Sequence, residues 1–270
     1  MDHLLQSKAP ISSAGWEAID EEAKSRLKTY LAARKLVDFD GPKGWSHSAT
    51  NLGRVSPVAK APADGVSARQ RRVLPLVELR AEFTVSRNEL DDVDRGAADA
   101  DLADLDQATR RIALAENVAV FHGYKAAGIE GITETSSHKP IGFDGEFEHL
   151  PTTVAKAVDV LRQAGIDGPY GLAIGPAGYT GIIETTEHGG LLLLDHLRQI
   201  LGGPVVWAPG VEGSVVLSVR GGDFVLDSGQ DLSIGYLDHD ANSVRLYLEE
   251  SFSFRVLESD AAVALKVVGS

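Results

Sequence analysis

The stretch of sequence that decides the fold covers residues 220–256 and reads RGGDFVLDSGQDLSIGYLDHDANSVRLYLEESFSFRV. Its second half alternates between apolar and polar side chains, which predicts β-structure. The apolar positions of that run are Val244, Leu246, Leu248, Phe252, Phe254 and Val256. A polar turn at residues 238–243 separates it from an earlier strand. The stretch holds no nucleophile–base pair, metal-ligand cluster or phosphate loop, so it predicts a scaffold rather than a catalytic centre.

Length and composition are those of a globular protein with one large domain or two small ones. The chain has 270 residues, of which 43% are hydrophobic and 24% charged. Its net charge of -13 argues against a nucleic-acid-binding surface and against adsorption to anionic membranes. The absence of cysteine excludes disulfides and a thiol nucleophile. Because residues 1–10 show no signal-peptide pattern and no apolar run has membrane length, we expect a soluble cytoplasmic protein.

Residues 12–35 carry the pattern of an amphipathic helix, with Ser12 or Ser13 as its expected N-cap. Its apolar positions follow helical spacing and are Trp16, Ile19, Ala23, Leu27, Tyr30 and Leu31. Acidic side chains come first and basic ones last, which suits the helix dipole. Two interpretations stay open: the apolar face packs only on its own domain, or it also meets a partner.

A long segment without periodicity precedes a clear strand. Residues 46–72 contain several turn-forming Gly and Pro residues and end in a basic cluster at residues 69–72. A loop of this length is either disordered or extended over another subunit. The basic cluster favours a solvated or subunit-pairing face over an anion site. Residues 76–85 alternate as a strand does, and we expect them to form a protruding hairpin with the segment before them.

An acidic segment and a long helix follow. Calcium binding by residues 89–106 is one interpretation, but their spacing does not fit an EF-hand loop. A solvated segment that caps the next helix fits better. That helix is predicted over residues 105–127. Further on, expected helices alternate with expected strands, which predicts a small α/β insertion; they cover residues 151–164, 169–174, 176–183, 191–201, 205–207 and 214–219.

No catalytic motif is present in the sequence. It lacks a Gly-x-Ser-x-Gly elbow, a Walker loop, a Gly-x-Gly-x-x-Gly loop and a His-Glu-x-x-His pair. Its eight histidines are scattered, with no pair at i, i+4 spacing. We therefore expect no enzyme activity, cofactor or metal, and only a triad assembled in space stays open.

Ordered blocks along nearly the whole chain resemble the encapsulins, the bacterial and archaeal shell proteins with the fold of tailed-phage major capsid proteins. The blocks include Gly41-Pro-Lys-Gly-Trp45, Leu74-Pro-Leu-Val-Glu-Leu-Arg80, Glu89-Leu-Asp-Asp-Val-Asp-Arg-Gly96, Arg220-Gly-Gly-Asp223 and Gly229-Gln-Asp-Leu-Ser-Ile-Gly-Tyr236. The resemblance implies an α+β, tailed-phage major-capsid-like fold. Its parts would be an amino-terminal interior helix and linker, an extended loop hairpin, a peripheral domain with a spine helix, an axial domain and returning peripheral strands. The corresponding ranges would be 1–45, 46–84, 85–135, 136–219 and 220–270.

The function that the resemblance implies is that of a self-assembling icosahedral nanocompartment shell, with roughly 60 copies. Such a shell encloses a cargo enzyme, of peroxidase or ferritin-like iron-storage type, through the cargo's terminal targeting peptide. The resemblance therefore implies a role in iron storage or in the response to oxidative stress. Two alternatives are a prophage major capsid protein and a stand-alone hydrolase or bacteriocin. The amino-terminal helix and the lack of a long scaffolding region favour the compartment shell.

The resemblance also implies two sites. Docking of the targeting peptide is expected at an apolar groove with a charged rim, made by Leu27, Tyr30, Leu31, Arg34, Asp38, Ile234 and Tyr236. A five-fold pore that gates small molecules or ions is expected at Thr185, Thr186, Glu187, His188, Gly189 and Gly190. Some family members stack a flavin on a Trp, but Asn88 stands at that position here, which argues against a flavin.

Overall fold

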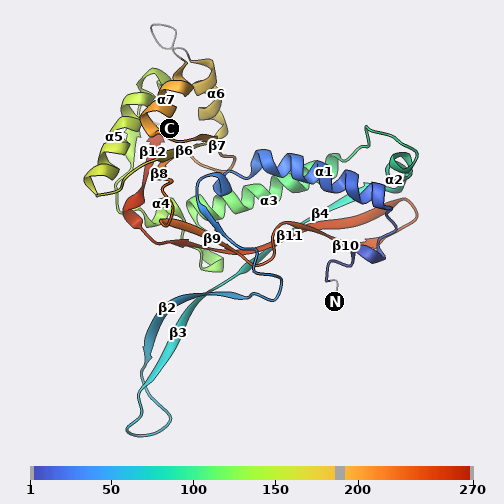
Figure 1. Cartoon of the computed structure of the whole chain (residues 1–270), viewed down its shortest axis with the longest axis horizontal. Helices are drawn as coiled ribbons and strands as arrows, with labels where there is room; N and C mark the ends of the chain where they lie inside the picture. Colours follow the sequence, from blue (N-terminus) through green and yellow to red (C-terminus); the bar gives the residue numbers. More distant parts are fainter. Residues whose placement is uncertain (1–2, 186–191, 268–270) are drawn as a thin grey trace.

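The chain forms three parts that differ in architecture (Figure 1). A five-stranded sheet with two long helices makes an elongated body, and a second five-stranded sheet with three helices makes a compact domain at one end. A two-stranded hairpin projects away from both. The computed structural model describes residues 3–185 and 192–267.

The first sheet is organised by β11 (Ser243–Val256). It pairs antiparallel with β4 (Val77–Ser86) along one edge, and with β10 (Ser233–His239) and β9 (Phe224–Ser228) along the other. The short β1 (Asp38–Asp40) extends the sheet by pairing parallel with β9. The apolar positions from Val244 to Phe254 are buried, as the pattern predicts, but the polar positions between Leu246 and Phe254 are buried as well.

Two long helices bury their apolar faces with this sheet. They are α1 (Ser13–Tyr30) and α3 (Ala103–His122), and the short α2 (Arg87–Asp94) lies between them in sequence. The N-cap of α1 is Ser12, whose Oγ accepts a hydrogen bond from the backbone N–H of Gly15 at 3.0 Å. Leu27 of α1 and Ile112 of α3 belong to one core cluster with Leu246 of β11.

Both helices end earlier than the sequence predicts. The buried Asn117 on α3 ends α1, because its Oδ1 accepts the N–H groups of Ala32 and Ala33 at 3.0 and 3.1 Å while its Nδ2 donates to the carbonyl of Tyr30 at 2.9 Å. A 3₁₀ turn, Ala33–Lys35, follows. Helix α3 ends at Gly123, whose positive φ of 86° takes the chain out of the helix, and another 3₁₀ turn covers Lys125–Ala127.

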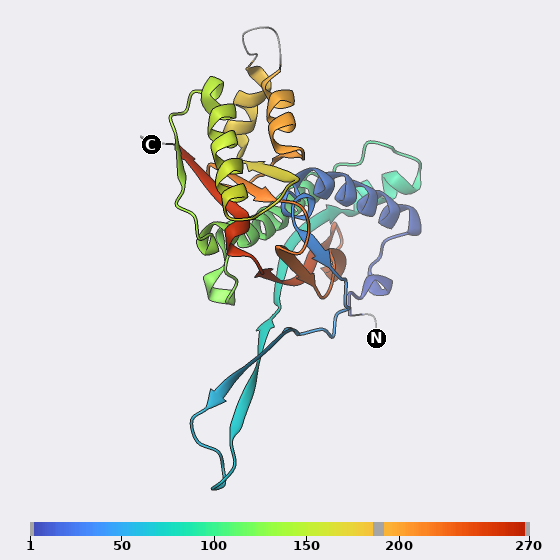
Figure 2. The same ribbon diagram turned by 60° about the vertical axis from the view of Figure 1, so that its left-hand side comes forward.

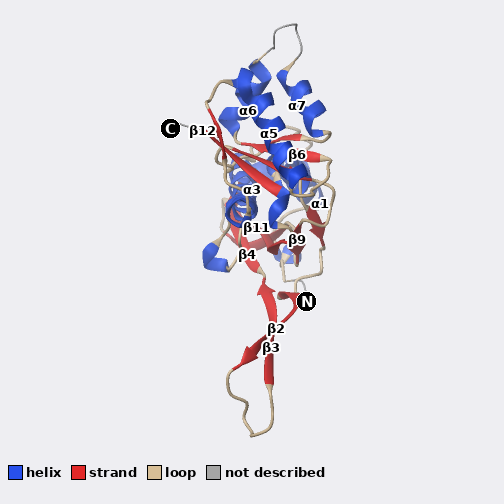
Figure 3. Cartoon of the chain, turned by 90° about the vertical axis from the view of Figure 1, so that its left-hand side faces the viewer, coloured by secondary structure: helices blue, strands red, loops and turns tan. Residues whose placement is uncertain are grey.

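The hairpin consists of β2 (Ala49–Val58) and β3 (Ala68–Pro75) (Figure 3). The expectation that residues 76–85 form one of its arms is therefore corrected. Those residues are β4, which pairs with β11 over ten positions from Val77 to Ser86. The reason is that Ala81, Phe83 and Val85 are buried against the core of the body, whereas a projecting hairpin offers no such cover.

The second sheet has the strand order β5-β12-β8-β6-β7. Its strands are β5 (Ile141–Phe143), β6 (Tyr170–Ile174), β7 (Val205–Trp207), β8 (Ser214–Ser218) and β12 (Ala262–Val267). The helices of this domain are α5 (Leu150–Gln163), α6 (Pro176–Glu184) and α7 (Leu193–Leu201), and the short α4 (Ile132–Thr135) precedes it.

Strand β12 does not join the first sheet, although the resemblance places residues 220–270 together as returning peripheral strands. Instead, β12 pairs antiparallel with β8 and parallel with β5. Its run from Ala262 to Leu265 is apolar and buried without alternation, as is typical of a strand covered on both faces.

The turn Arg220–Asp223 joins the two sheets. Arg220 donates from Nε and Nη2 to the two carboxylate oxygens of Asp223 at 3.0 and 2.9 Å. The backbone N–H of Gly222 donates to the carboxylate of Asp38, which ties the turn to β1. Gly221 and Gly222 both have positive φ, 89° and 84°, so glycine suits both positions.

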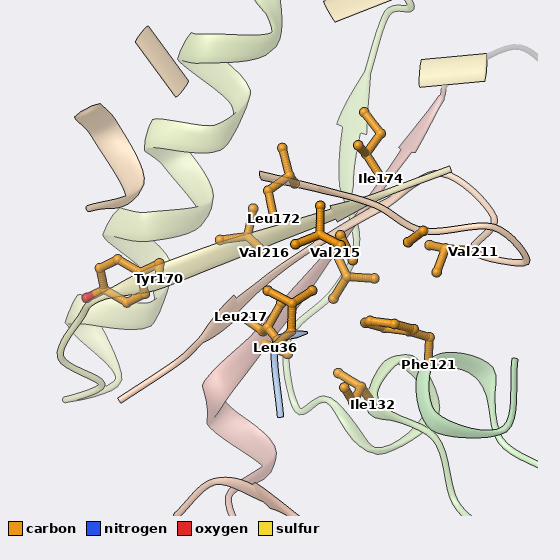
Figure 4. Packing of buried hydrophobic residues seen from close by; sticks show 14 of the residues in the cluster. Leu36, Phe121, Ile132, Tyr170, Leu172, Ile174, Val211, Val215, Val216 and Leu217 are labelled. Atoms are coloured by element: carbon orange, nitrogen blue, oxygen red, sulfur yellow. The ribbon is translucent and has the colours of Figure 1, made fainter. Parts of the chain in front are cut away.

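One core cluster runs across this junction (Figure 4). Leu36 from the end of the amino-terminal segment and Phe121 from α3 pack on the same cluster as Val215 and Leu217 of β8. The body and the compact domain are therefore bound by a continuous core.

Candidate functional site

Two elements supply most of the residues predicted to dock a peptide. Leu27 and Tyr30 lie on the last turns of α1 and Leu31 is its C-cap, whereas Ile234 and Tyr236 lie on β10. Both elements belong to the same core cluster. All five residues pack in or against this one cluster, and we call the faces of α1 and β10 that carry them the α1–β10 surface.

The five residues divide by exposure. Leu27 and Ile234 are buried, with 8% and 4% of their surface exposed, so their first role is in the core. Tyr30, Leu31 and Tyr236 are partly buried and pack against the same cluster. The accessible part of the α1–β10 surface is therefore made by these three side chains, which can contact a ligand without leaving the core.

Neighbouring contacts fix this surface. The Tyr30 ring lies 5.7 Å from the Trp207 ring, centroid to centroid. The hydroxyl of Tyr236 lies 2.6 Å from Nδ1 of His239. The backbone N–H of Tyr236 donates to the carbonyl of Leu4 at 2.8 Å. The amino-terminal segment therefore runs beside β10 and covers part of its edge (Figure 1).

Arg34 lies among three carboxylates. It donates from Nε to Glu116 at 2.7 Å, from Nη1 to Asp231 at 2.7 Å and from Nη2 to Glu250 at 2.9 Å. Its guanidinium also stands 4.9 Å from the centre of the Phe39 ring. Burial opposes the charge of Arg34, but Glu116 and Glu250 outweigh it and raise the pKa of the guanidinium.

The same network holds a carboxyl pair in the core. Glu116 and Glu250 are almost completely buried, and Oε1 of each has no hydrogen-bond partner among the described residues. Burial first, and then the neighbouring Glu116, raise the pKa of Glu250 well above its ordinary value, against the opposing effect of Arg34. Glu250 is therefore harder to ionise than a solvated glutamate.

Sequence reasoning missed Glu116, Asp231 and Glu250 as partners of Arg34. One signal was available for Glu250: it occupies the same alternation phase of β11 as Leu248 and Phe252. A carboxyl group at a core-facing strand position requires a buried partner. Nothing comparable in the local sequence marks Glu116 or Asp231.

Asp38 stands apart from the α1–β10 surface. It lies on β1 and accepts the N–H of Gly222 at the turn between the sheets. A small pocket of about 140 Å³ connects it to Arg34, and residues 34–38 and 218–224 provide its walls.

Of the predicted pore residues, the described part of the chain includes only Thr185. Thr185 follows α6 and donates from Oγ1 to the carbonyl of Gly181 at 2.7 Å. Thr186, Glu187, His188, Gly189 and Gly190 lie outside the described residues. Asn88, at the position considered for flavin stacking, is exposed near the start of α2.

The described ranges were compared with the requirements of a metal site and of a membrane-spanning helix. Within residues 3–185 and 192–267, no group of three or more His, Cys, Asp or Glu side chains is placed to hold a metal ion. Over the same residues, no helix is both long and apolar enough to span a bilayer.

Known proteins match this chain over almost its full length. A family model described as "Encapsulating protein for peroxidase" matches residues 1–253. The type 1 encapsulin shell protein of Rhodospirillum rubrum is 47% identical over 271 residues, which cover 98% of this chain and 97% of the relative.

Solved structures agree on the fold. A virus-like particle from Pyrococcus furiosus matches with a TM-score of 0.66 at 18% identity, covering 93% of this chain and 99% of that one. The capsid of an empty GTA particle matches with a TM-score of 0.54 at 15% identity, covering 88% and 89%. The predicted capsid-like α+β fold is therefore confirmed.

Proposed function

Since this chain belongs to the encapsulin family of shell proteins, we propose that it assembles into a closed icosahedral compartment of roughly 60 copies in the cytoplasm. The observation that carries the proposal is the match to shell proteins over nearly the whole chain. These homologues are structural capsid proteins rather than enzymes, which agrees with the absence of a catalytic motif from the sequence.

Electron microscopy and native mass spectrometry of the purified protein test the assembly. Sixty copies of the 28.7 kDa chain give a particle of about 1.7 MDa, and negative stain is expected to show closed particles of one size. A monomer or small oligomer at micromolar concentration would overturn the proposal. Particles filled with DNA would favour a phage capsid instead.

The cargo proposal rests on the α1–β10 surface. Tyr30, Leu31 and Tyr236 offer partly exposed apolar area, and Arg34, which follows α1, pairs with Asp231, which precedes β10. Such a surface suits a short peptide with apolar anchors, the kind that a targeting peptide on a cargo enzyme would provide. The printed family description favours a peroxidase as the cargo.

A loading assay with variants of the α1–β10 surface tests the cargo proposal. A fluorescent protein carrying the terminal peptide of a family peroxidase is co-expressed with the shell. Leu31→Asp and Tyr236→Asp are expected to lower the loaded fraction at least about tenfold, because a charge replaces an apolar contact. The control is Lys28→Asp, an exposed position on the same helix. Equal loading in all variants would exclude this surface.

For the pore, we propose that five copies of residues 185–190 line an opening whose Glu187 and His188 side chains favour small cations. Entry of a cation into intact particles is followed with an enclosed fluorescent indicator. Glu187→Gln with His188→Asn is expected to slow entry, and an unchanged rate would refute the role of these residues.

A further inference from the structure

The hairpin of β2 and β3 projects from the rest of the chain and, among the described strands, pairs with no third strand (Figures 2 and 3). Both faces are accessible, and Val55, Val58 and Val73 expose 52%, 44% and 47% of their surfaces. A two-stranded sheet without further cover is marginally stable in water. Exposed apolar side chains mixed with arginines are typical of surfaces that become buried on association.

Four exposed arginines occupy defined positions on this hairpin. Arg54 on β2 stands directly opposite Arg72 on β3, immediately after a register shift between Asn51 and Arg54. Strand alternation places Arg69 and Arg71 on the other face. Like charges directly across a strand pair destabilise it, so the Arg54–Arg72 pair is unfavourable in an isolated chain.

No carboxylate of the described residues lies within ion-pair distance of these four arginines. Elsewhere in the chain, Arg34, Arg80, Arg220, Arg245 and Arg255 each pair with at least one carboxylate, whereas Arg87 and Arg111 donate to backbone carbonyls. Among the described residues the hairpin arginines thus have no ion pair, although Arg72 lines a pocket that Glu130 also lines.

The source of a counter-charge follows from the charge balance. Residues 46–75 carry five basic side chains and one acidic side chain, a net charge of +4, whereas the whole chain carries -13. The remainder of the chain therefore carries -17, and its surface is the acidic partner that a basic hairpin meets when copies associate.

We propose that Arg54 and Arg72 together bind a carboxylate from a second copy of this chain. Each guanidinium presents a planar fork of donors that matches a carboxylate, and one carboxylate between the two relieves their repulsion. This inference rests on the proposed shell function and adds to it the residues through which the hairpin recognises its neighbour. It also makes the contact sensitive to salt.

A matched pair of double variants tests the assignment. Arg54→Gln with Arg72→Gln is compared with Arg69→Gln and Arg71→Gln, which removes the same charge from the opposite face. The concentration for half-assembly is measured by light scattering at low salt and at about 1 M salt. At low salt, Arg54→Gln with Arg72→Gln is expected to raise the concentration for half-assembly at least about tenfold. The control, Arg69→Gln with Arg71→Gln, is expected to raise it less than about threefold.

The assembly results distinguish failure of the proposed function from failure of the inference about Arg54 and Arg72. Wild-type protein that never forms closed particles overturns the proposed function itself. Closed wild-type particles with equal assembly of both double variants overturn only the role of Arg54 and Arg72. If nuclease treatment of wild-type particles abolishes assembly, nucleic acid is the counter-charge and the inference fails. Circular dichroism confirms that each variant retains its secondary structure.

Cross-linking identifies the partner directly. Arg54→Lys with Arg72→Lys keeps both charges and introduces amines that a carbodiimide joins to a neighbouring carboxylate, releasing the urea. Particles are assembled from equal amounts of ¹⁴N- and ¹⁵N-labelled chains. Cross-linked peptides of mixed label from position 54 or 72 support the inference. Cross-links of single label only, or none from these positions, overturn it.

Discussion

Nη2 of Arg34 donates a hydrogen bond to Oε2 of Glu250 at 2.9 Å, which joins the segment after α1 to the middle of β11. The two residues are 216 positions apart in the sequence. Because Arg34 also binds Glu116, one guanidinium connects α3 and the segment after α1 to the central strand of the body. The α1–β10 surface therefore depends on an ion network beneath it.

Replacing Arg34 with Met tests that dependence. The variant leaves Glu116 and Glu250 buried without a cation, and loss of one partner from a buried ion network destabilises a protein by about 3–5 kcal/mol. Denaturant unfolding at fixed subunit concentration measures the loss. Arg245→Met is the control, since it removes exposed ion pairs with Asp238 and Glu82 that contribute less than about 1 kcal/mol. Equal effects of the two substitutions would contradict the interpretation.

Glu250→Gln is expected to change how stability depends on pH. Because the pKa of Glu250 is raised in the folded protein, its contribution is complete below the unfolded value and is lost as pH rises toward the folded one. Wild-type protein should therefore lose stability relative to Glu250→Gln between about pH 5 and pH 8. The melting temperature across this range measures the difference. Glu17→Gln, at an exposed position of α1, should run parallel to wild type.

The regular elements were predictable where one face is buried. The stripe of Leu105, Ala108 and Ile112 identifies α3, because burial of one face imposes its period. Strand β11 alternates in sequence although its residues from Leu246 to Phe254 are all buried. The boundaries were less predictable. Helix α1 is ended by Asn117, a side chain more than eighty positions away, and no local residue records that contact.

Strand partners and side-chain networks were the least predictable. Residues 262–265 show an apolar run that fits any buried strand, so their sheet is set by pairing with β8 rather than by pattern. The docking residues were inferred from resemblance as one group. Only the structure separates the buried Ile234 from the partly exposed Tyr236, and only the structure reveals the carboxylates around Arg34.

Gly235→Ala is expected to disturb the α1–β10 surface from within. A Cβ at this position would lie 2.1 Å from Cζ of the Tyr247 ring, so the ring or β10 must move. Overpacking of this kind costs about 1–3 kcal/mol and shifts the neighbouring Tyr236. In a Tyr247→Ala background the same substitution should cost less, because the ring is gone. Additive effects in this double-mutant cycle would show that the contact does not matter.

His122 predicts a pH response of the opposite sign to that of Glu250. Its Nε2 accepts the backbone N–H of Glu212 at 3.0 Å, so the ring is neutral and its Nδ1–H faces Oγ1 of Thr133 at 3.0 Å. These contacts hold the end of α3 to α4 and to the loop after β7. Burial lowers the pKa of His122, and Lys266 lowers it further, against the carboxylates of Glu212 and Glu134.

A lowered histidine pKa means that the contribution of His122 is complete above about pH 6.5 and is lost as pH falls toward the folded value. His122→Gln keeps an acceptor for Glu212 but does not titrate, so its melting temperature should fall less than that of wild type between about pH 7 and pH 5. The control is His149→Gln, because hydrogen bonding to Asp144 raises the pKa of His149 and gives its slope the reverse sign. If His122→Gln leaves the pH dependence of the melting temperature unchanged, another group causes the loss of stability in acid. That group is not Glu250, because its protonation stabilises the protein as pH falls over the same range.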